Sequence, residues 1–203
     1  ELPEGYSYAE YARSGFSELM IVAVINLIVI IVMNYCAKNE GGGKTKALRA
    51  YILVLCAFTL FIIATAIAKM VMYISEYGLT QLRVYTMWFM ILLTFLFVMI
   101  IMRQFKRNFN IVKYFGIVFI GMFALLCFSR PDACIAKYNI EMYESGYIEE
   151  LDYSQLTGLS DDAFLTAYKN GYIDEKQLEE RIADKDAYDK MNYSTFMLWV
   201  YSE

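Results

Sequence analysis

The sequence predicts an all-α, polytopic membrane protein with four transmembrane helices and a small C-terminal extracytoplasmic helical domain. Three observations predict it: long apolar runs, basic residues confined to alternate connections, and an acidic C-terminal third. At about 1.5 Å per residue, each run forms a helix close to or above the ~30 Å of hydrocarbon in a bilayer. The apolar runs cover residues 17–35, 47–74, 82–102 and 112–128.

Charge divides the chain into two parts. Residues 129–203 hold 16 acidic against 7 basic side chains, whereas residues 1–128 hold 6 against 11. A strongly acidic segment disfavours nucleic-acid partners, which need basic surfaces. We therefore expect three domains: an interfacial amphipathic helix over 1–16, a four-helix transmembrane domain over 17–128, and an acidic α-helical extracytoplasmic domain over 129–203.

The N-terminal lead alternates aromatic residues with Glu10 and Arg13, which is typical of a short interfacial helix that leads into the first span. The chain opens at Glu1 and shows no basic n-region or small-residue cleavage site of a signal peptide. We expect it to be a piece of a longer protein.

The connections between spans predict the topology. The first carries Lys38, Lys44, Lys46 and nearby Arg49 against one acid, and the third carries Arg103, Lys106, Arg107 and Lys113 with no acid. The positive-inside rule places both in the cytoplasm. The N-terminal lead, the Tyr77-Gly78 turn and the acidic tail then lie outside.

Helix signals in the tail predict a small bundle. Pro131 opens a helix that Gly146 closes, and Ser160-Asp161-Asp162 caps one that ends at Asn170-Gly171. Asp174 and Gln177, preceded by Ile173, resemble a capping box with a hydrophobic staple, which begins a helix running to about Lys190. Residues 193–201 form a possible last segment. The expected core is Ile135, Ile140, Leu151, Leu156, Leu159, Leu165, Leu178 and Ile182.

Ionisable residues near the outer ends of the spans are the candidate site for a ligand or partner. Charge within hydrocarbon costs several kcal/mol unless it is paired or hydrated. Lys69 has most need of a partner, and Glu18 or Glu76 lies at a matching depth. Three interpretations stay open: an ion-pair network between helices, outward snorkelling of Lys69, or a site for an anionic ligand, lipid headgroup or proton. The candidate residues are Glu10, Arg13, Glu18, Lys69, Glu76 and Arg83.

Deeper polar and small residues predict helix packing. Asn26 is expected to donate an interhelical hydrogen bond, and Ala64 and Ala68 to form a close-packing face. Cys56 is expected to be a small packing residue. A disulfide between Cys127 and Cys134 is disfavoured because seven helical residues separate them by about 10 Å.

The sequence gives little support for nucleotide binding, metal or cofactor binding, or catalysis by paired acids. Gly41-Gly42-Gly43-Lys44-Thr45 lacks the first glycine of a phosphate-binding loop, because Lys38 stands there, so we interpret it as a basic hairpin. Without histidine or a CxxC pair, we expect no metal site and no cofactor. Adjacent acids such as Asp161 and Asp162 are better explained as helix caps than as catalytic groups.

Three stretches resemble a bacterial polytopic membrane family of unknown function, the DUF-4173 type, akin to DUF-4153. They are the "YAEYAR-x-GF-x-x-L" lead from Tyr8, the "YGLT-x-x-R" turn from Tyr77, and the "IA-x-YN" helix from Ile135 with its "LS-x-DA" sequel from Leu159. The resemblance implies a multi-pass protein of the bacterial cytoplasmic membrane. It also implies that the following residues belong to recurrent motifs: Tyr11, Arg13, Gly15, Phe16, Tyr77, Gly78, Thr80, Arg83, Tyr138 and Asn139.

The sequence favours a non-enzymatic role for this integral membrane protein, in binding, signalling or scaffolding through its extracytoplasmic face. Membrane lipids and a protein partner or second copy are the expected partners. Two alternatives stay open. One is a transporter or channel component whose pathway needs upstream helices. The other is an envelope enzyme that acts on lipid or glycan through a pair of carboxyl groups in unlike environments.

Overall fold

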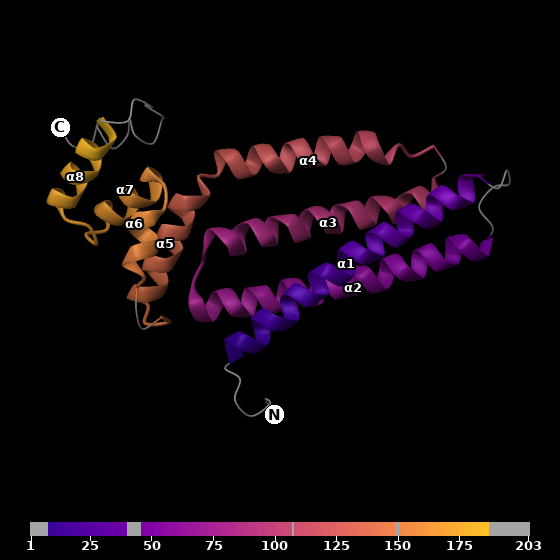
Figure 1. Ribbon diagram of the computed structural model, residues 1–203, viewed down its shortest axis with the longest axis horizontal. Helices are drawn as coiled ribbons and strands as arrows, with labels where there is room; N and C mark the ends of the chain where they lie inside the picture. Colours follow the sequence, from indigo (N-terminus) through magenta and orange to yellow (C-terminus); the bar gives the residue numbers. More distant parts are fainter. Residues whose placement is uncertain (1–7, 40–45, 107, 149–150, 187–203) are drawn as a thin grey trace. The chain divides into compact units, whose positions relative to one another are not determined.

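A computed structural model describes residues 8–39, 46–106, 108–148 and 151–186, excluding the side chains of 8–15, 35–39, 155 and 182–186. These described residues form helices and turns and contain no strand. The helices are α1 Tyr8–Asn39, α2 Lys46–Tyr77, α3 Gln81–Phe105, α4 Ile111–Phe128, α5 Pro131–Glu144, α6 Tyr153–Gly158, α7 Asp161–Lys169 and α8 Glu175–Asp186 (Figure 1).

The chain folds as two compact units. The first joins Glu1–Glu76 to Leu82–Ala124, and the second joins Tyr77–Gln81 to Leu125–Glu203. The turn between α2 and α3 therefore groups with the C-terminal helices, although it lies inside the 17–128 segment expected to form the transmembrane domain. The reason is a set of hydrogen bonds from α5, described below.

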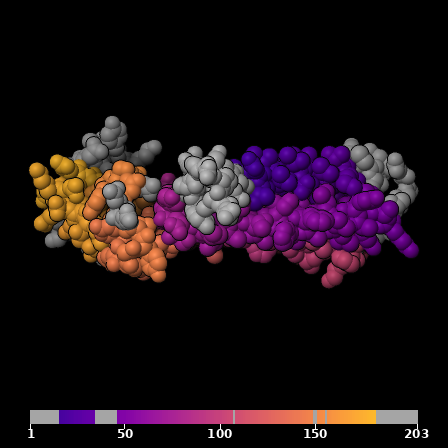
Figure 2. Space-filling view, turned by 90° about the horizontal axis from the view of Figure 1, so that it is seen from below, coloured from indigo at the N-terminus to yellow at the C-terminus, as the bar shows by residue number. Residues whose placement is uncertain are grey.

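The four predicted spans are confirmed, and the protein has the all-α fold of a polytopic membrane protein. Four helices are long and apolar enough to cross a bilayer: Phe16–Asn34, Lys46–Tyr77, Gln81–Phe105 and Ile111–Phe128. Within the first unit these helices run alongside one another (Figure 1), and α1 and α2 cover the face seen in Figure 2. Many of their large apolar side chains are exposed, as a lipid-facing surface requires.

The core of the first unit is built by α1, α2 and α3. Ile30, Cys56 and Phe97 are almost fully buried there. The predicted interhelical bond is confirmed, because Asn26 Nδ2–H donates to the Thr59 hydroxyl at 3.0 Å. Helix α4, in contrast, buries none of its residues.

The prediction of a packing face at Ala64 and Ala68 is wrong, because both residues are exposed. Helix α2 buries Ile63, Ala66 and Met70 instead. These three follow the i, i+3, i+7 spacing of one helical stripe, which Ala64 and Ala68 do not share. Two small residues four positions apart mark a helix face that allows close packing. In α2, however, the face with the larger apolar side chains is the one that packs against the other helices.

The lead and the first span form one helix rather than two. Helix α1 begins at Tyr8 and continues to Asn39 without a break. No proline interrupts this stretch, and its single glycine, Gly15, lowers helix stability by only about 1 kcal/mol.

Helix ends in the second unit follow the predicted signals. Gly146 and Gly171 adopt left-handed conformations, with φ of +74° and +79°. Gln177 Oε1 accepts the Asp174 backbone N–H at 3.2 Å, which is one of the two hydrogen bonds of the predicted capping box. Helix α6 was not predicted; its first turn is held by Asp152, which accepts the Ser154 N–H at 3.0 Å.

The core of this unit also agrees with prediction. Six of the eight expected residues are buried and Leu159 is partly buried, while the side chain of Ile182 and the segment 193–201 lie outside the described residues. The structure adds small and aromatic core residues that the predicted core lacked, Ala136, Ala163, Phe164 and Ala167, and it buries the staple residue Ile173 among them.

Candidate functional site

The turn that joins α2 to α3 is held by a side chain from α5. The Leu79 N–H donates to Asn139 Oδ1 at 2.7 Å, and Asn139 Nδ2–H donates to the Leu79 carbonyl oxygen at 2.9 Å. Asn139 is only 8% exposed. Buried backbone groups need hydrogen-bond partners, and here one amide satisfies both groups of the same residue. The result is a two-point clamp on the turn.

Gly78 is required in this clamp for two reasons. Its φ of +72° is a left-handed conformation that side chains with a Cβ disfavour. In addition, a Cβ at this position would lie 2.6 Å from Asn139 Oδ1. The close approach of Asn139 to the turn therefore depends on glycine.

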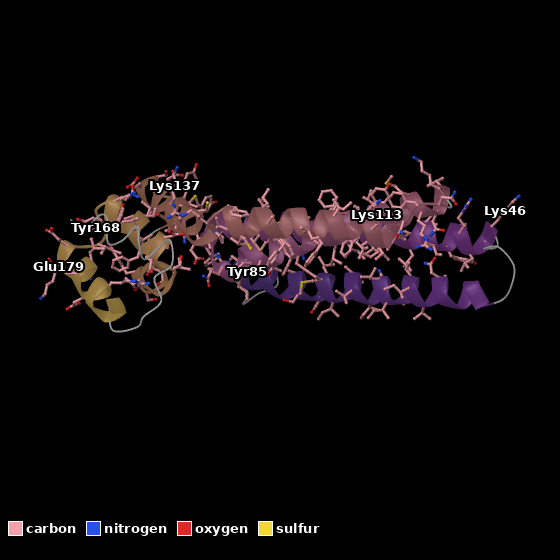
Figure 3. The ribbon with its side chains drawn as sticks, turned by 90° about the horizontal axis from the view of Figure 1, so that it is seen from above. Lys46, Tyr85, Lys113, Lys137, Tyr168 and Glu179 are labelled. Atoms are coloured by element: carbon pink, nitrogen blue, oxygen red, sulfur yellow. The ribbon has the colours of Figure 1, made fainter. Side chains whose placement is uncertain are left out.

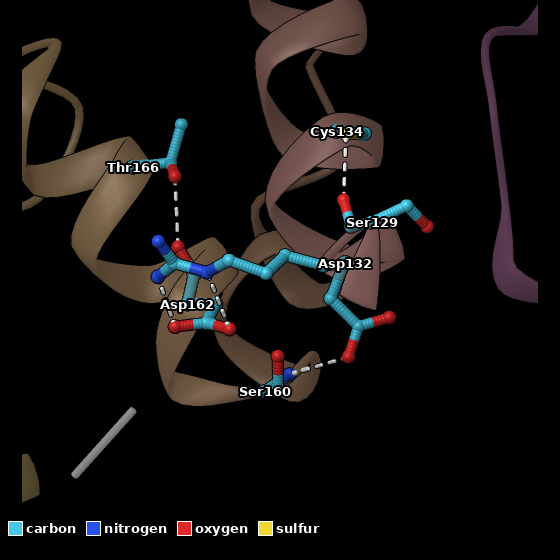
Figure 4. Close-up of polar contacts among 7 residues, drawn as sticks. Ser129, Asp132, Cys134, Ser160, Asp162 and Thr166 are labelled. Atoms are coloured by element: carbon cyan, nitrogen blue, oxygen red, sulfur yellow. Dashed lines mark hydrogen bonds and ion pairs between the residues drawn. The ribbon is translucent and has the colours of Figure 1, made fainter. Parts of the chain in front are cut away.

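Asp132, in the first turn of α5, binds two further segments. Its Oδ1 accepts a hydrogen bond from Gln81 Nε2 at 2.8 Å, and its Oδ2 accepts the Ser160 N–H at 3.4 Å (Figure 4). Ser160 is the N-cap of α7, so one carboxylate joins the end of the clamped turn to the start of another helix.

Arg130 and Asp162 form an ion pair between the start of α5 and α7 (Figure 4). Arg130 Nε donates to Asp162 Oδ2 at 2.9 Å, and Nη2 donates to Oδ1. Asp162 is 9% exposed. Arg130 has a φ of +49° and precedes Pro131, which begins the helix. The two-pronged geometry is the strong form of an arginine–carboxylate contact.

A second arginine attaches α8. Arg181 Nε donates to Asp161 at 3.2 Å, while its Nη atoms donate to the carbonyl oxygens of Thr157 and Leu159. The guanidinium also stacks on the Phe164 ring, 4.7 Å from its centroid. Asp161 is 2% exposed. The buried charge is therefore matched by a cation whose donors are satisfied.

These contacts make the buried acids structural. Each carboxylate is already engaged by a guanidinium, Asp162 by Arg130 and Asp161 by Arg181. Elsewhere in this unit, partial desolvation and the hydrogen bond to Glu144 raise the pKa of the Tyr172 phenol. Within the described residues, no group of three potential ligands lies close enough to hold a metal ion.

The charged residues predicted as a site do not form one described cluster. Glu18 and Glu76 are exposed, and neither forms an ion pair with another described residue. Lys69 is half-buried and has other contacts. Arg83 stacks over the Tyr73 ring at 4.2 Å. The pairing of Lys69 with Glu18 or Glu76 is therefore not found. Glu10 and Arg13 lie on α1, with side chains outside the described residues.

Two of the predicted motif residues, in contrast, do come together in the structure. Gly78 and Asn139, from two separate motifs, meet in the clamp. Around them, Thr80 and Tyr138 are half-buried and Tyr77 is exposed. The remaining motif residues lie on α1: Phe16 is buried in the core of the first unit, and the side chains of Tyr11 and Gly15 are outside the described residues.

Sequence reasoning missed the arginines that hold the second unit together. Asp161 and Asp162 were interpreted as caps, and they do begin α7, yet their carboxylates bind Arg181 and Arg130. The available signal was the pair of acids on a helix with an apolar face. Nothing local identified partners 20 and 32 residues away.

Comparison with known proteins identifies the family to which the chain belongs. A family model described as "Domain of unknown function (DUF4153)" matches residues 1–170. No curated protein and no solved structure matches the chain.

Proposed function

Because the chain belongs to the DUF4153 family, whose description assigns no activity, we propose a role from its geometry: a non-enzymatic membrane module whose C-terminal helical unit binds a basic protein partner. The observation that carries this proposal is that the acidic residues of that unit fall into two groups, one buried and ion-paired and the other exposed. Buried Asp161 and Asp162 are neutralised internally, whereas Glu175, Glu179 and Glu180 of α8 are exposed.

Helix α8 supplies the acidic surface. It packs through Leu178, which is 2% exposed, and through the Arg181 contacts. Glu175, Glu179 and Glu180 are all exposed, and Glu179 lies on the outer side of the helix in Figure 3. Complementary charge steers association and selects partners. A helix whose exposed glutamates form no ion pair within the described part of the chain suits a surface rich in lysine or arginine.

A zero-length crosslinking experiment tests this proposal. A carbodiimide joins carboxylates only to amines that touch them, so it reports contacts between these glutamates and partner lysines. The full-length protein is treated in its native membrane, and adducts on residues 175–180 are identified by mass spectrometry. We expect adducts that disappear when salt rises to about 1 M, where the Debye length is about 3 Å.

The matched variants are a triple substitution, E175Q/E179Q/E180Q, and Glu141→Gln on α5 of the same unit. Glu141 is exposed but pairs with Lys137 on its own helix at 3.7 Å. The triple variant is expected to lose the adducts and Glu141→Gln to keep them. Equal adducts in all three proteins, or adducts that persist at high salt, contradict the proposal.

For topology we propose that this unit lies outside the bacterial cytoplasmic membrane, with the basic connections in the cytoplasm. The support is the positive-inside rule, and Figure 3 shows Lys46 toward one end of the first unit and Tyr85 toward the other. Cys134 is a free, exposed thiol on α5. With the other three cysteines replaced, a membrane-impermeant maleimide is expected to label it on intact cells. Labelling that occurs only after lysis would show the opposite topology, with this unit in the cytoplasm.

Transport remains the alternative function. Within the described residues, every span is an unbroken helix, whereas many transporters build their sites from discontinuous helices. The test is uptake of candidate solutes into vesicles that contain the full-length protein. Uptake faster than into empty vesicles would favour transport over the binding role.

A further inference from the structure

A groove in the first unit lies beside α4, between it and the helices α1 and α3. It has a volume of about 760 Å³ and is lined by α1, α3 and α4. Ile30 and Leu96 form part of one wall, and Phe115 and Phe119 part of the other. This volume falls within the range of ligand pockets in proteins. No residue of α4 is fully buried, although Trp88 of α3 donates from Nε1 to the Met122 carbonyl oxygen at 3.1 Å.

The groove is apolar along its length and polar at one end. Asn34, Arg103 and Gln104 line that end, at the close of α1 and α3. From Gln104 to Leu96, the groove follows α3 for eight residues, or about 12 Å at the helical rise. A binding molecule must therefore be amphiphilic, with a polar head beside Arg103 and an apolar chain directed toward Leu96.

Charge defines the polar head. Arg103 is exposed in the last turn of α3, and no described residue forms an ion pair with it. The connection that follows carries Lys106, Arg107 and Lys113 with no acid. This end of the unit is therefore positive, whichever side of the membrane it occupies. Basic pockets between transmembrane helices recognise anionic lipid headgroups.

A second groove repeats the pattern. It has a volume of about 590 Å³, and it too is lined by α3 and α4 residues, Phe95 and Ile117 among them. At its polar end lie Lys106 and Tyr114. Each groove thus has an apolar wall and one cation from the segment that joins α3 to α4, Arg103 in the first and Lys106 in the second. Apolar walls with a cation at one end suit lipid molecules better than water.

We propose that the groove between α1, α3 and α4 is a binding site for an anionic phospholipid. One acyl chain lies between Leu96 and Phe115, and Arg103 binds the phosphate. The site differs from the acidic surface of α8 in position and in charge. It gives α4, which packs weakly on the protein, a lipid neighbour that holds it in place.

Photocrosslinking tests the site directly. The purified full chain is placed in phosphatidylcholine nanodiscs that contain a trace of phosphatidylglycerol carrying a diazirine in one acyl chain. After irradiation, labelled peptides are mapped by mass spectrometry. We expect labels on residues 112–119 and 96–100, with unlabelled phosphatidylglycerol competing more effectively than unlabelled phosphatidylcholine.

Two pairs of variants separate headgroup from chain recognition. Arg103→Gln should lower labelling about fivefold, since a cation near an anionic lipid contributes about 1 kcal/mol. Arg49→Gln removes an exposed cation from the other basic connection, lines neither groove, and should leave labelling unchanged.

Gly116 and Gly121 provide the second pair. Both lie on α4, and a Cβ added to either meets nothing within 4 Å, so leucine should be tolerated at both. Only Gly116 lines the groove. Gly116→Leu is expected to block labelling of 112–119, and Gly121→Leu to leave it intact.

The proposal is overturned if both lipids compete equally and Arg103→Gln labels like the wild type. It is also overturned if Gly116→Leu and Gly121→Leu label alike. Exclusion of the probe, with α4 crosslinked instead to another protein helix or a second copy, would show that protein fills the groove.

Discussion

Asn139 binds both the N–H and the carbonyl oxygen of Leu79, at 2.7 and 2.9 Å, across sixty residues of sequence. The asparagine lies on α5, and the leucine lies in the turn between two spans. One side chain therefore joins this turn to the helical unit that follows the last span.

Asn139→Ala should release the turn. Leu79 would keep two partly buried backbone groups without their partner, which costs about 1 kcal/mol or more. Hydrogen exchange measured by mass spectrometry should show loss of protection in the peptide 77–83. Asn170→Ala is the control, because Asn170 is exposed and bonds only to Thr166 of its own helix. Unchanged exchange at 77–83 in Asn139→Ala would contradict the clamp.

Gly78→Ala should destabilise the second unit more than Gly146→Ala. Both glycines have φ above +70°, so each substitution carries a conformational cost of about 1 kcal/mol. Only at Gly78 does the new Cβ meet a neighbour, Asn139 Oδ1 at 2.6 Å. Thermal denaturation in detergent should rank the two variants in that order.

The same substitution gives a coupling test. In the double variant Gly78→Ala with Asn139→Ala, the clash disappears, while the conformational cost at position 78 and the loss of the two Asn139 hydrogen bonds remain. The two losses should therefore sum to more than the loss in the double variant. Simple additivity would show that the two residues do not interact.

Arg181→Met should cost about 3 kcal/mol or more in the free energy of unfolding. It leaves Asp161 buried and charged without its cation, a penalty typical of a broken buried ion pair. Lys137→Met is the matched control, since its pair with Glu141 is exposed and contributes less than about 1 kcal/mol. Denaturant titration followed by circular dichroism measures both. Equal losses would contradict the assignment.

Thr59→Val should weaken packing between α1 and α2. The substitution removes the acceptor of the Asn26 hydrogen bond at nearly constant volume, and bonds of this kind in membranes contribute about 0.6 kcal/mol on average. Thr65→Val is the control, because the Thr65 hydroxyl is exposed and donates only to carbonyls of its own helix. A difference between the two in unfolding free energy isolates the interhelical bond.

The spans and most helix ends in the second unit were predictable because their causes are local. A run of apolar residues long enough for a bilayer needs no partner to be recognised. Gly146, Gly171 and the Asp174–Gln177 capping box act within one turn of the helix that they end or begin. The family resemblance likewise followed from short motifs, and the match over residues 1–170 confirmed it.

The pairings could not be predicted in the same way. Sequence singled out Asn139 and Gly78 as motif residues, yet it could not place them against each other, and it assigned Asp161 and Asp162 to caps alone. It also proposed Ala64 and Ala68 as a packing face that the structure leaves exposed. Each of these depends on which surface another helix covers.

Backbone conformation and solvent preference are properties of neighbouring residues, so the four spans and most helices of the second unit could be inferred from the amino acids alone. Contacts such as Arg181–Asp161, and the open groove beside Arg103, arise only when distant helices meet. The physical reason is that a hydrogen bond or ion pair gains its strength from burial, and burial is a property of the assembled chain.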